Sequence, residues 1–201
     1  MLFATAKPTS FMLFNLAAAF YALCLIPVGL TQLPQPRPTP VPLLRPLKFY
    51  RLAPVGIAGC IAVGLANSAI WTLAPIYAQH HGLTKGLLAL FMSVFTLGGA
   101  VIQVPLGRLS DRIDRRIIIA AVSTLSAVLG VLLALFGGRH EWLTLGLVTL
   151  FGVTALPIYG LSVAHTNDRI PREAFVEASA TLLMTNSLVS VLGPPLAAII
   201  T

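Results

Sequence analysis

Long apolar runs separated by short polar gaps constrain this chain more than any other feature. Six stretches contain no Lys, Arg or Asp and only one Glu, Glu177, at an extreme end; they are 11–30, 53–77, 86–106, 117–138, 142–164 and 175–200. About 20 apolar residues in a helix cross the hydrocarbon core of a bilayer, and a charge at mid-helix costs about 2.5–3.5 kcal/mol. The sequence therefore predicts an all-α fold, a polytopic membrane bundle with six transmembrane helices.

The composition excludes other classes of protein. Only 9% of the 201 residues are charged, and 57% belong to the apolar set, whereas about 25% of an ordinary soluble domain is charged. These residues cannot supply the polar surface of a soluble fold. A disordered chain needs low hydrophobicity, and two cysteines are too few for a disulfide scaffold. The lipid bilayer is thus the first expected partner.

The net charge of +7 records topology rather than nucleic-acid binding, because the basic residues lie in gaps between apolar runs. Three alternate gaps, 31–52, 107–116 and 165–174, hold most of them: Arg37, Arg45, Lys48, Arg51, Arg108, Arg112, Arg115, Arg116, Arg169 and Arg172. The other side holds Lys7, Lys85 and Arg139. Cytoplasmic loops are enriched in Lys and Arg. The three loops are therefore predicted to be cytoplasmic and the N-terminus external.

The gap after the first apolar run is rich in proline. Residues 33–46 read LPQPRPTPVPLLRP, and proline removes a backbone donor and disfavours helix. This composition predicts a stiff, extended linker. The expected organisation is a single transmembrane helix at 1–30, a basic cytoplasmic linker at 31–52 and five helices at 53–201. A cleaved signal peptide is a less favoured alternative for the first run, which exceeds the usual 7–15 apolar residues.

The densest charge cluster joins the third and fourth predicted spans. It reads GRLSDRIDRR over 107–116 and resembles the inter-helix signature of the major facilitator superfamily of transporters: Gly, three residues, Asp, a basic residue, one residue, Gly and two basic residues. Gly107, Asp111, Arg112, Arg115 and Arg116 match it. Asp114 stands where the family has glycine, and its side chain can cap a helix that starts near Arg115.

The resemblance implies a placement within a twelve-helix protein. The signature recurs between helices 8 and 9 of this family, and a long cytoplasmic linker joins helices 6 and 7. The six spans thus look like helices 6 to 11, and residues 155–169 resemble helix 10 and its following loop in an uncharacterised bacterial branch. The chain is then expected to be a fragment in the inner membrane. Its missing partner would be the N-terminal half, helices 1 to 5.

The resemblance also implies a function: transport of a small solute by alternating access, with no cofactor, metal or catalytic residue. The Asp of the signature helps to close the cytoplasmic side against the other half. The expected gating loop consists of Gly107, Arg108, Asp111, Arg112, Asp114, Arg115 and Arg116. A simpler alternative is that this cluster only fixes the topology, since any membrane protein can use basic loops in that way.

Polar side chains near the span centres are candidates for the solute cavity. Intramembrane polar groups usually face protein or a water-filled space, and transporter sites lie near the midplane. Asn67, Trp71, Tyr159 and Asn186 are the candidates. The alternative is hydrogen bonding between helices, worth about 0.6 kcal/mol on average. Recurring glycines, Gly160 among them, are expected to let helix backbones approach closely.

Two rival functions remain open. A non-transporting membrane subunit or an inactive remnant would keep the same helices. A membrane-embedded, metal-dependent lipid enzyme would use the pair Asp111 and Asp114, but such enzymes bring more carboxylates than the six acidic residues of this chain provide. The sequence identifies neither the solute nor the coupling ion.

Overall fold

The computed structural model describes residues 11–31, 46–80 and 84–200, which form helices joined by short connections. The chain divides into two compact units, Met1–Val41 and Pro42–Thr201. The first contains α2 (Met12–Leu30), the predicted first span. Its apolar stretch, Phe14–Pro27, is shorter than the five stretches of the described chain that are long and apolar enough to cross a membrane. The predicted extended linker lies outside the described residues except for Pro46, which begins a helix.

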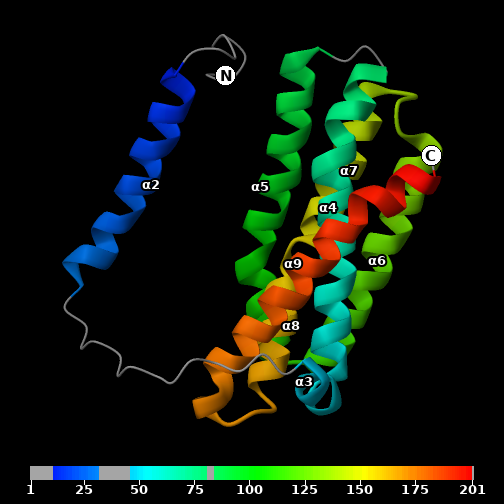
Figure 1. Ribbon diagram of the computed structural model, residues 1–201. Coiled ribbons are helices and arrows are strands. Elements are labelled where there is room, and N and C mark those ends of the chain that lie inside the picture. The colour runs from blue at the N-terminus through cyan, green and yellow to red at the C-terminus, as the bar shows by residue number, and fades with distance from the viewer. Residues whose placement is uncertain (1–10, 32–45, 81–83, 201) are drawn as a thin grey trace. The chain divides into compact units, whose positions relative to one another are not determined.

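The second unit is a helix bundle (Figure 1). In chain order its elements are α3 (Pro46–Leu52), α4 (Pro54–His80), α5 (Lys85–Ser110), α6 (Arg115–Phe136), α7 (Glu141–Ala155), α8 (Pro157–Asn167), the 3₁₀ turn η1 (Arg172–Ala174) and α9 (Phe175–Ile200). Five stretches are long and apolar enough to cross a membrane, with α7 and α8 counted as one. They confirm five of the predicted spans to within about one helical turn.

A proline divides the fourth of these spans. α7 ends at Ala155 and α8 begins at Pro157, because proline has no N–H to donate and its ring clashes with the preceding turn. Leu156 between them keeps helical angles, φ −64° and ψ −38°, and its N–H donates to the Gly152 carbonyl at 3.2 Å. The two segments therefore form one bent helix.

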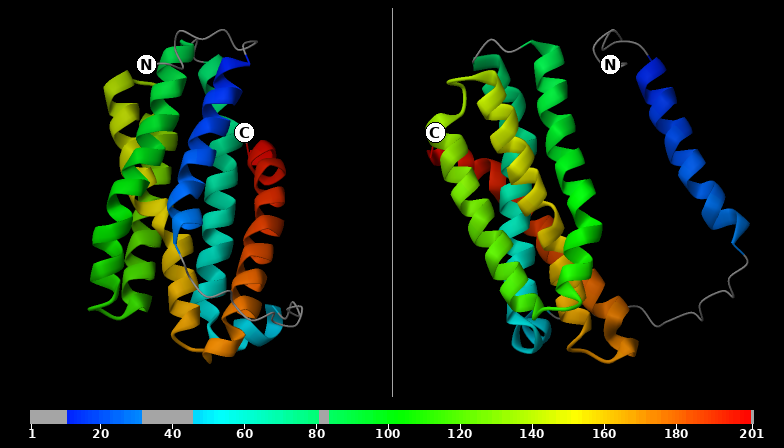
Figure 2. Two further views of the ribbon diagram at one scale, coloured as in Figure 1. Left: turned by 90° about the vertical axis from the view of Figure 1, so that its left-hand side faces the viewer. Right: turned by 180° about the vertical axis from the view of Figure 1, so that it is seen from behind.

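Small residues set how closely the helices of the second unit pack, and Figure 2 shows these helices side by side. α4 contacts α9 and α8, while α7 contacts α5 and α6. A Cβ atom added at any of these glycines would meet a neighbouring helix: Gly56, Gly59, Gly64, Gly98, Gly99, Gly152 and Gly193. The prediction that Gly160 lets two helix backbones approach closely is wrong, because a Cβ atom added there would face open space. Close backbone approach is thus the main use of glycine between these helices.

Candidate functional site

One arginine ties together two connections at the same end of the bundle. Arg115, the first residue of α6, donates from Nη2 to the Asp111 carboxylate at the end of α5. Its Nε lies 3.2 Å from Asp168 Oδ2, at the end of α8. The Arg115 side chain is 19% exposed, against 64% and 56% for the two carboxylates. The predicted gating loop is therefore linked by charge to α8 as well as to its own helices.

Asp114 explains why the loop needs no glycine at that position. Its backbone has φ −52° and ψ 118°, a region open to any residue, and its Oδ1 accepts from the Arg116 N–H at 2.9 Å. This contact satisfies one of the donors that an α-helix leaves unpaired at its start. The expected cap of α6 is confirmed, and the departure from the family pattern replaces a turn residue by a capping residue.

Removing this cap is expected to have a modest and specific cost. Asp114→Ala should lower the free energy of unfolding by about 1 kcal/mol, whereas Asp114→Gly should cost only a few tenths. Thermal unfolding of the purified chain in detergent measures both. Equal losses for the two variants would contradict capping as the role of this side chain.

A groove lies between α5 and α8 beside the charged cluster. It encloses about 370 Å³, and its walls include Gln103, Gly107, Asp111, Arg115, Tyr159 and Gly160. Neither glycine meets another part of the described chain, because a Cβ added at either would find open space. Unlike the glycines buried between helices, these two leave room for a further backbone to approach.

The structure distributes the four predicted cavity residues over three helices. Tyr159 of α8 lines the groove with the gating loop. Asn186 of α9 donates from Nδ2 to the Cys60 carbonyl of α4 at 3.1 Å, a helix–helix contact. Trp71 of α4 is 53% exposed and meets Phe95 edge-on, with ring centroids 6.1 Å apart. Asn67 Oδ1 is buried without a hydrogen-bond partner among the described residues. Tyr159 alone among the four lines this groove, and the roles of all four in a solute cavity stay predictions.

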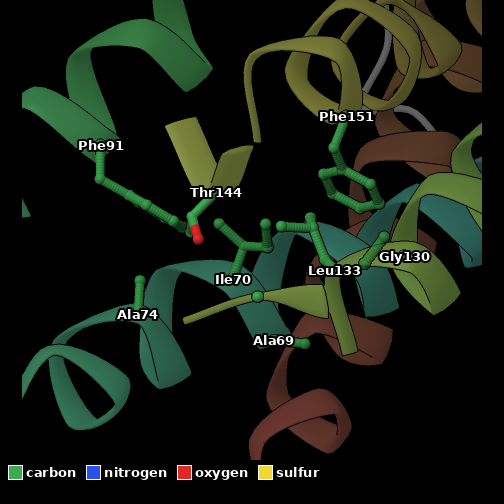
Figure 3. A pocket seen from close by; sticks show the side chains of 10 residues that line it. Ala69, Ile70, Ala74, Phe91, Gly130, Leu133, Thr144 and Phe151 are labelled. Atoms are coloured by element: carbon green, nitrogen blue, oxygen red, sulfur yellow. The ribbon is translucent and has the colours of Figure 1, made fainter. Parts of the chain in front are cut away.

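A second cavity, of about 300 Å³, lies among α4, α5, α6 and α7. Figure 3 shows Ile70, Phe91, Leu133 and Phe151 around it, and Thr144 carries the only side-chain oxygen among the labelled residues. That hydroxyl donates to the His140 carbonyl and accepts from the Gly138 N–H, each at 3.0 Å. None of the four predicted cavity residues lines this space. It suits an apolar group better than a polar solute.

The two acidic residues of the loop are engaged in structural contacts. Asp111 pairs with Arg115, and Asp114 caps α6. Throughout the described ranges, no group of three or more His, Cys, Asp or Glu side chains is placed to hold a metal ion.

Two features of this end of the bundle were not predicted. The pairing of Asp168 with Arg115 joins residues far apart in sequence, and the motif alone does not indicate it. The helix α3 lies where the sequence predicts only linker, and its Phe49 is fully buried. A pair of aromatic residues between two basic ones, just before a span, was the available signal.

Comparisons with known proteins agree with this architecture. The Major Facilitator Superfamily model matches residues 56–201. The uncharacterized MFS-type transporter YcaD of Escherichia fergusonii is 27% identical over 75% of this chain and 38% of its own length. A second relative, Ent638_1421 of Enterobacter sp. strain 638, is 27% identical over 77% of this chain and 39% of its own.

The chain thus spans about 38% of the length of such relatives. No solved structure matches it. The family match covers most of the chain and, except for the first two residues of the first one, includes all five spanning stretches of the second unit. This multi-pass membrane protein belongs to the Major Facilitator Superfamily, whose members are transporters rather than enzymes.

Proposed function

We propose that the chain acts as part of a secondary transporter that moves a small solute across the bacterial inner membrane by alternating access. The observation that carries this proposal is the Arg115 cluster, which holds the gating loop beside a groove with two open glycines. In alternating access, one helix bundle rocks against another around a fixed site. Such a motion requires a surface that leaves room for a second bundle next to the charged loop.

The charge distribution supports the orientation. The α3 end of the bundle carries Lys48, Arg51, Arg108, Arg112, Arg115, Arg116, Arg169 and Arg172, whereas the described residues of the other end include Lys85 and Arg139. The positive-inside rule places the α3 end in the cytoplasm. The groove and the gating loop then form the cytoplasmic face of the proposed gate.

We expect the gate to close over the groove between α5 and α8. A helix of the N-terminal half, helices 1 to 5 of the whole transporter, would lie over Gly107 and Gly160 in the closed state and move away in the open state. Arg108 and Arg112 are exposed on the same loop and would meet carboxylates or helix C-termini of that half, where a cation is favourable. The cluster around Arg115 keeps the loop in position during the motion.

The orientation makes a direct prediction about thiol labelling. In a Cys24→Ala background, Arg112→Cys should not react with a membrane-impermeant maleimide on intact cells but should react in inside-out vesicles. Arg139→Cys, a matched exposed arginine at the other end, should show the reverse. Cys60 is fully buried and stays as it is. Labelling of Arg112→Cys from outside would overturn the proposed topology.

Transport itself is tested in membrane vesicles from cells that express the chain, so that any partner half is present. Uptake of labelled sugars, amino acids, nucleosides and lipophilic cations should reveal one accepted class. Asp111→Asn should reduce that uptake, while Asp114→Gly should largely retain it. If a folded, correctly oriented chain moves no solute, the non-transporting subunit is favoured. Metal-dependent turnover of a lipid, lost in Asp111→Asn, would favour the enzyme instead.

A further inference from the structure

The short helix α3 (Pro46–Leu52) has two faces of different character. Phe49 and Ala53, one helical turn apart, are both 0% exposed and face the bundle. On the opposite side Leu47 is 79% exposed and Tyr50 56% exposed, and Arg51 is exposed beside them. Residues three and four apart share one face of a helix, so Leu47, Tyr50 and Arg51 form a single outward surface with two apolar members and one cation.

The inward face fixes α3 to the bundle. Phe49 packs in a buried cluster with Ile57 of α4 and Leu182 of α9. Lys48 Nζ lies 3.3 Å from Glu177 Oε2, in the first turn of α9. Figure 1 shows α3 beside the beginning of α4, and α3 also contacts α9. The outward surface is therefore held in a fixed direction rather than being carried on a loose linker.

The position of α3 places this surface at the edge of the bilayer. The first candidate span of the bundle begins at Pro54, two residues after α3 ends. A tyrosine, a leucine and an arginine side by side suit the headgroup layer, where amphipathic side chains bury their apolar parts and keep their polar tips hydrated. In water, the exposed Leu47 and Tyr50 would leave a hydrophobic surface uncovered.

We propose that α3 lies on the membrane surface and binds the headgroups of anionic phospholipids through Arg51, with Leu47 and Tyr50 inserted between the lipids. The sign of the charge selects the lipid: α3 shares its end of the bundle with most of the basic residues described. Each Lys or Arg near an anionic leaflet contributes about 1 kcal/mol. The proposal rests on membrane insertion and not on transport, so its failure would leave the proposed function untouched.

Tryptophan quenching in bilayers tests this inference. The full chain carries Tyr50→Trp with Trp71→Phe and Trp142→Phe, and it is reconstituted in mixtures of phosphatidylglycerol and phosphatidylcholine, one of which is brominated. The preference of the new indole for phosphatidylglycerol should be about fivefold. Adding Arg51→Gln should reduce that preference, because it removes the cation next to the indole. Arg51 is exposed, so this variant should fold normally.

A matched reporter controls for bulk lipid effects. Trp142, 82% exposed at the other end of the bundle, becomes the only indole when Trp71→Phe is made alone. It should be quenched equally by the two lipids. Equal quenching of the indole at position 50 would overturn the recognition of anionic lipid. An indole at position 50 that neither lipid quenches would overturn the surface location, and would indicate a protein partner on that face.

Discussion

Replacing Gly152 with alanine is expected to cause a large loss of stability, about 3 kcal/mol or more. A Cβ atom at this position would overlap the carbonyl oxygen of Phe95 and lie 2.9 Å from its carbonyl carbon. Those are backbone atoms of α5, so the neighbour cannot move aside as a flexible side chain could. The whole α5–α7 contact would have to separate, including the stacked rings of Phe95 and Phe151, whose centroids lie 6.2 Å apart.

Gly146 on the same helix provides the control. A Cβ atom there meets nothing within 4 Å, so Gly146→Ala should leave stability unchanged or raise it by about 0.5–1 kcal/mol, since alanine is the better helix former. Thermal unfolding of both variants in one detergent, followed by gel filtration, gives the comparison. Similar midpoints for the two variants would show that α5 and α7 do not pack as closely as described.

Gly152 and Gly160 show which features of the fold cannot be predicted from the sequence. Apolar length predicted five spans to within about a turn, because bilayer thickness sets the length of a helix regardless of its neighbours. Which glycines face a neighbouring helix depends on helix rotation, and the apolar runs carry little information about that. Gly152 and Gly160 therefore looked alike in sequence, although the first is wedged against Phe95 and the second faces open space.

In the candidate site, too, contacts between sequence neighbours can be predicted, whereas contacts between distant residues cannot. The cap by Asp114 joins neighbours in sequence, and the motif was enough to predict it. The pairing of Asp111 with Arg115 is equally local, at a separation of four residues, although it was not predicted. The contact of Asp168 with Arg115 and the bond from Asn186 to Cys60, 126 residues apart, exist only in the folded bundle. The sequence left two roles open for Asn186, lining the solute cavity or hydrogen bonding between helices. The bond to Cys60 is a contact of the second kind.

The missed helix α3 has a related cause. Its seven residues follow a proline-rich stretch and include two cations, so no apolar period marks it. It is stable because Phe49 enters a cluster formed by α4 and α9, and short helices in water depend on such packing rather than on propensity. The end of the predicted linker therefore belongs to the bundle, where it contacts α4 and α9.

The stability of this attachment is expected to rest on one side chain. Phe49→Ala should lower the free energy of unfolding by about 3–5 kcal/mol, the cost of removing a fully buried phenyl ring and leaving a cavity. Phe49→Leu should cost less, because it retains most of the apolar volume. Both are measured by thermal unfolding in detergent, together with proteolysis after Lys48 or Arg51, which should accelerate when α3 detaches.

Tyr50 is the matched control, since it is an aromatic neighbour that is 56% exposed. Tyr50→Ala should change stability by no more than about 0.5 kcal/mol, as surface substitutions do. If Phe49→Ala unfolds no earlier than Tyr50→Ala, α3 is not anchored by its phenylalanine. The Lys48–Glu177 pair cannot replace that anchor, because an exposed ion pair contributes at most about 1 kcal/mol. Burial of Phe49 therefore decides whether the linker moves with the bundle or independently of it.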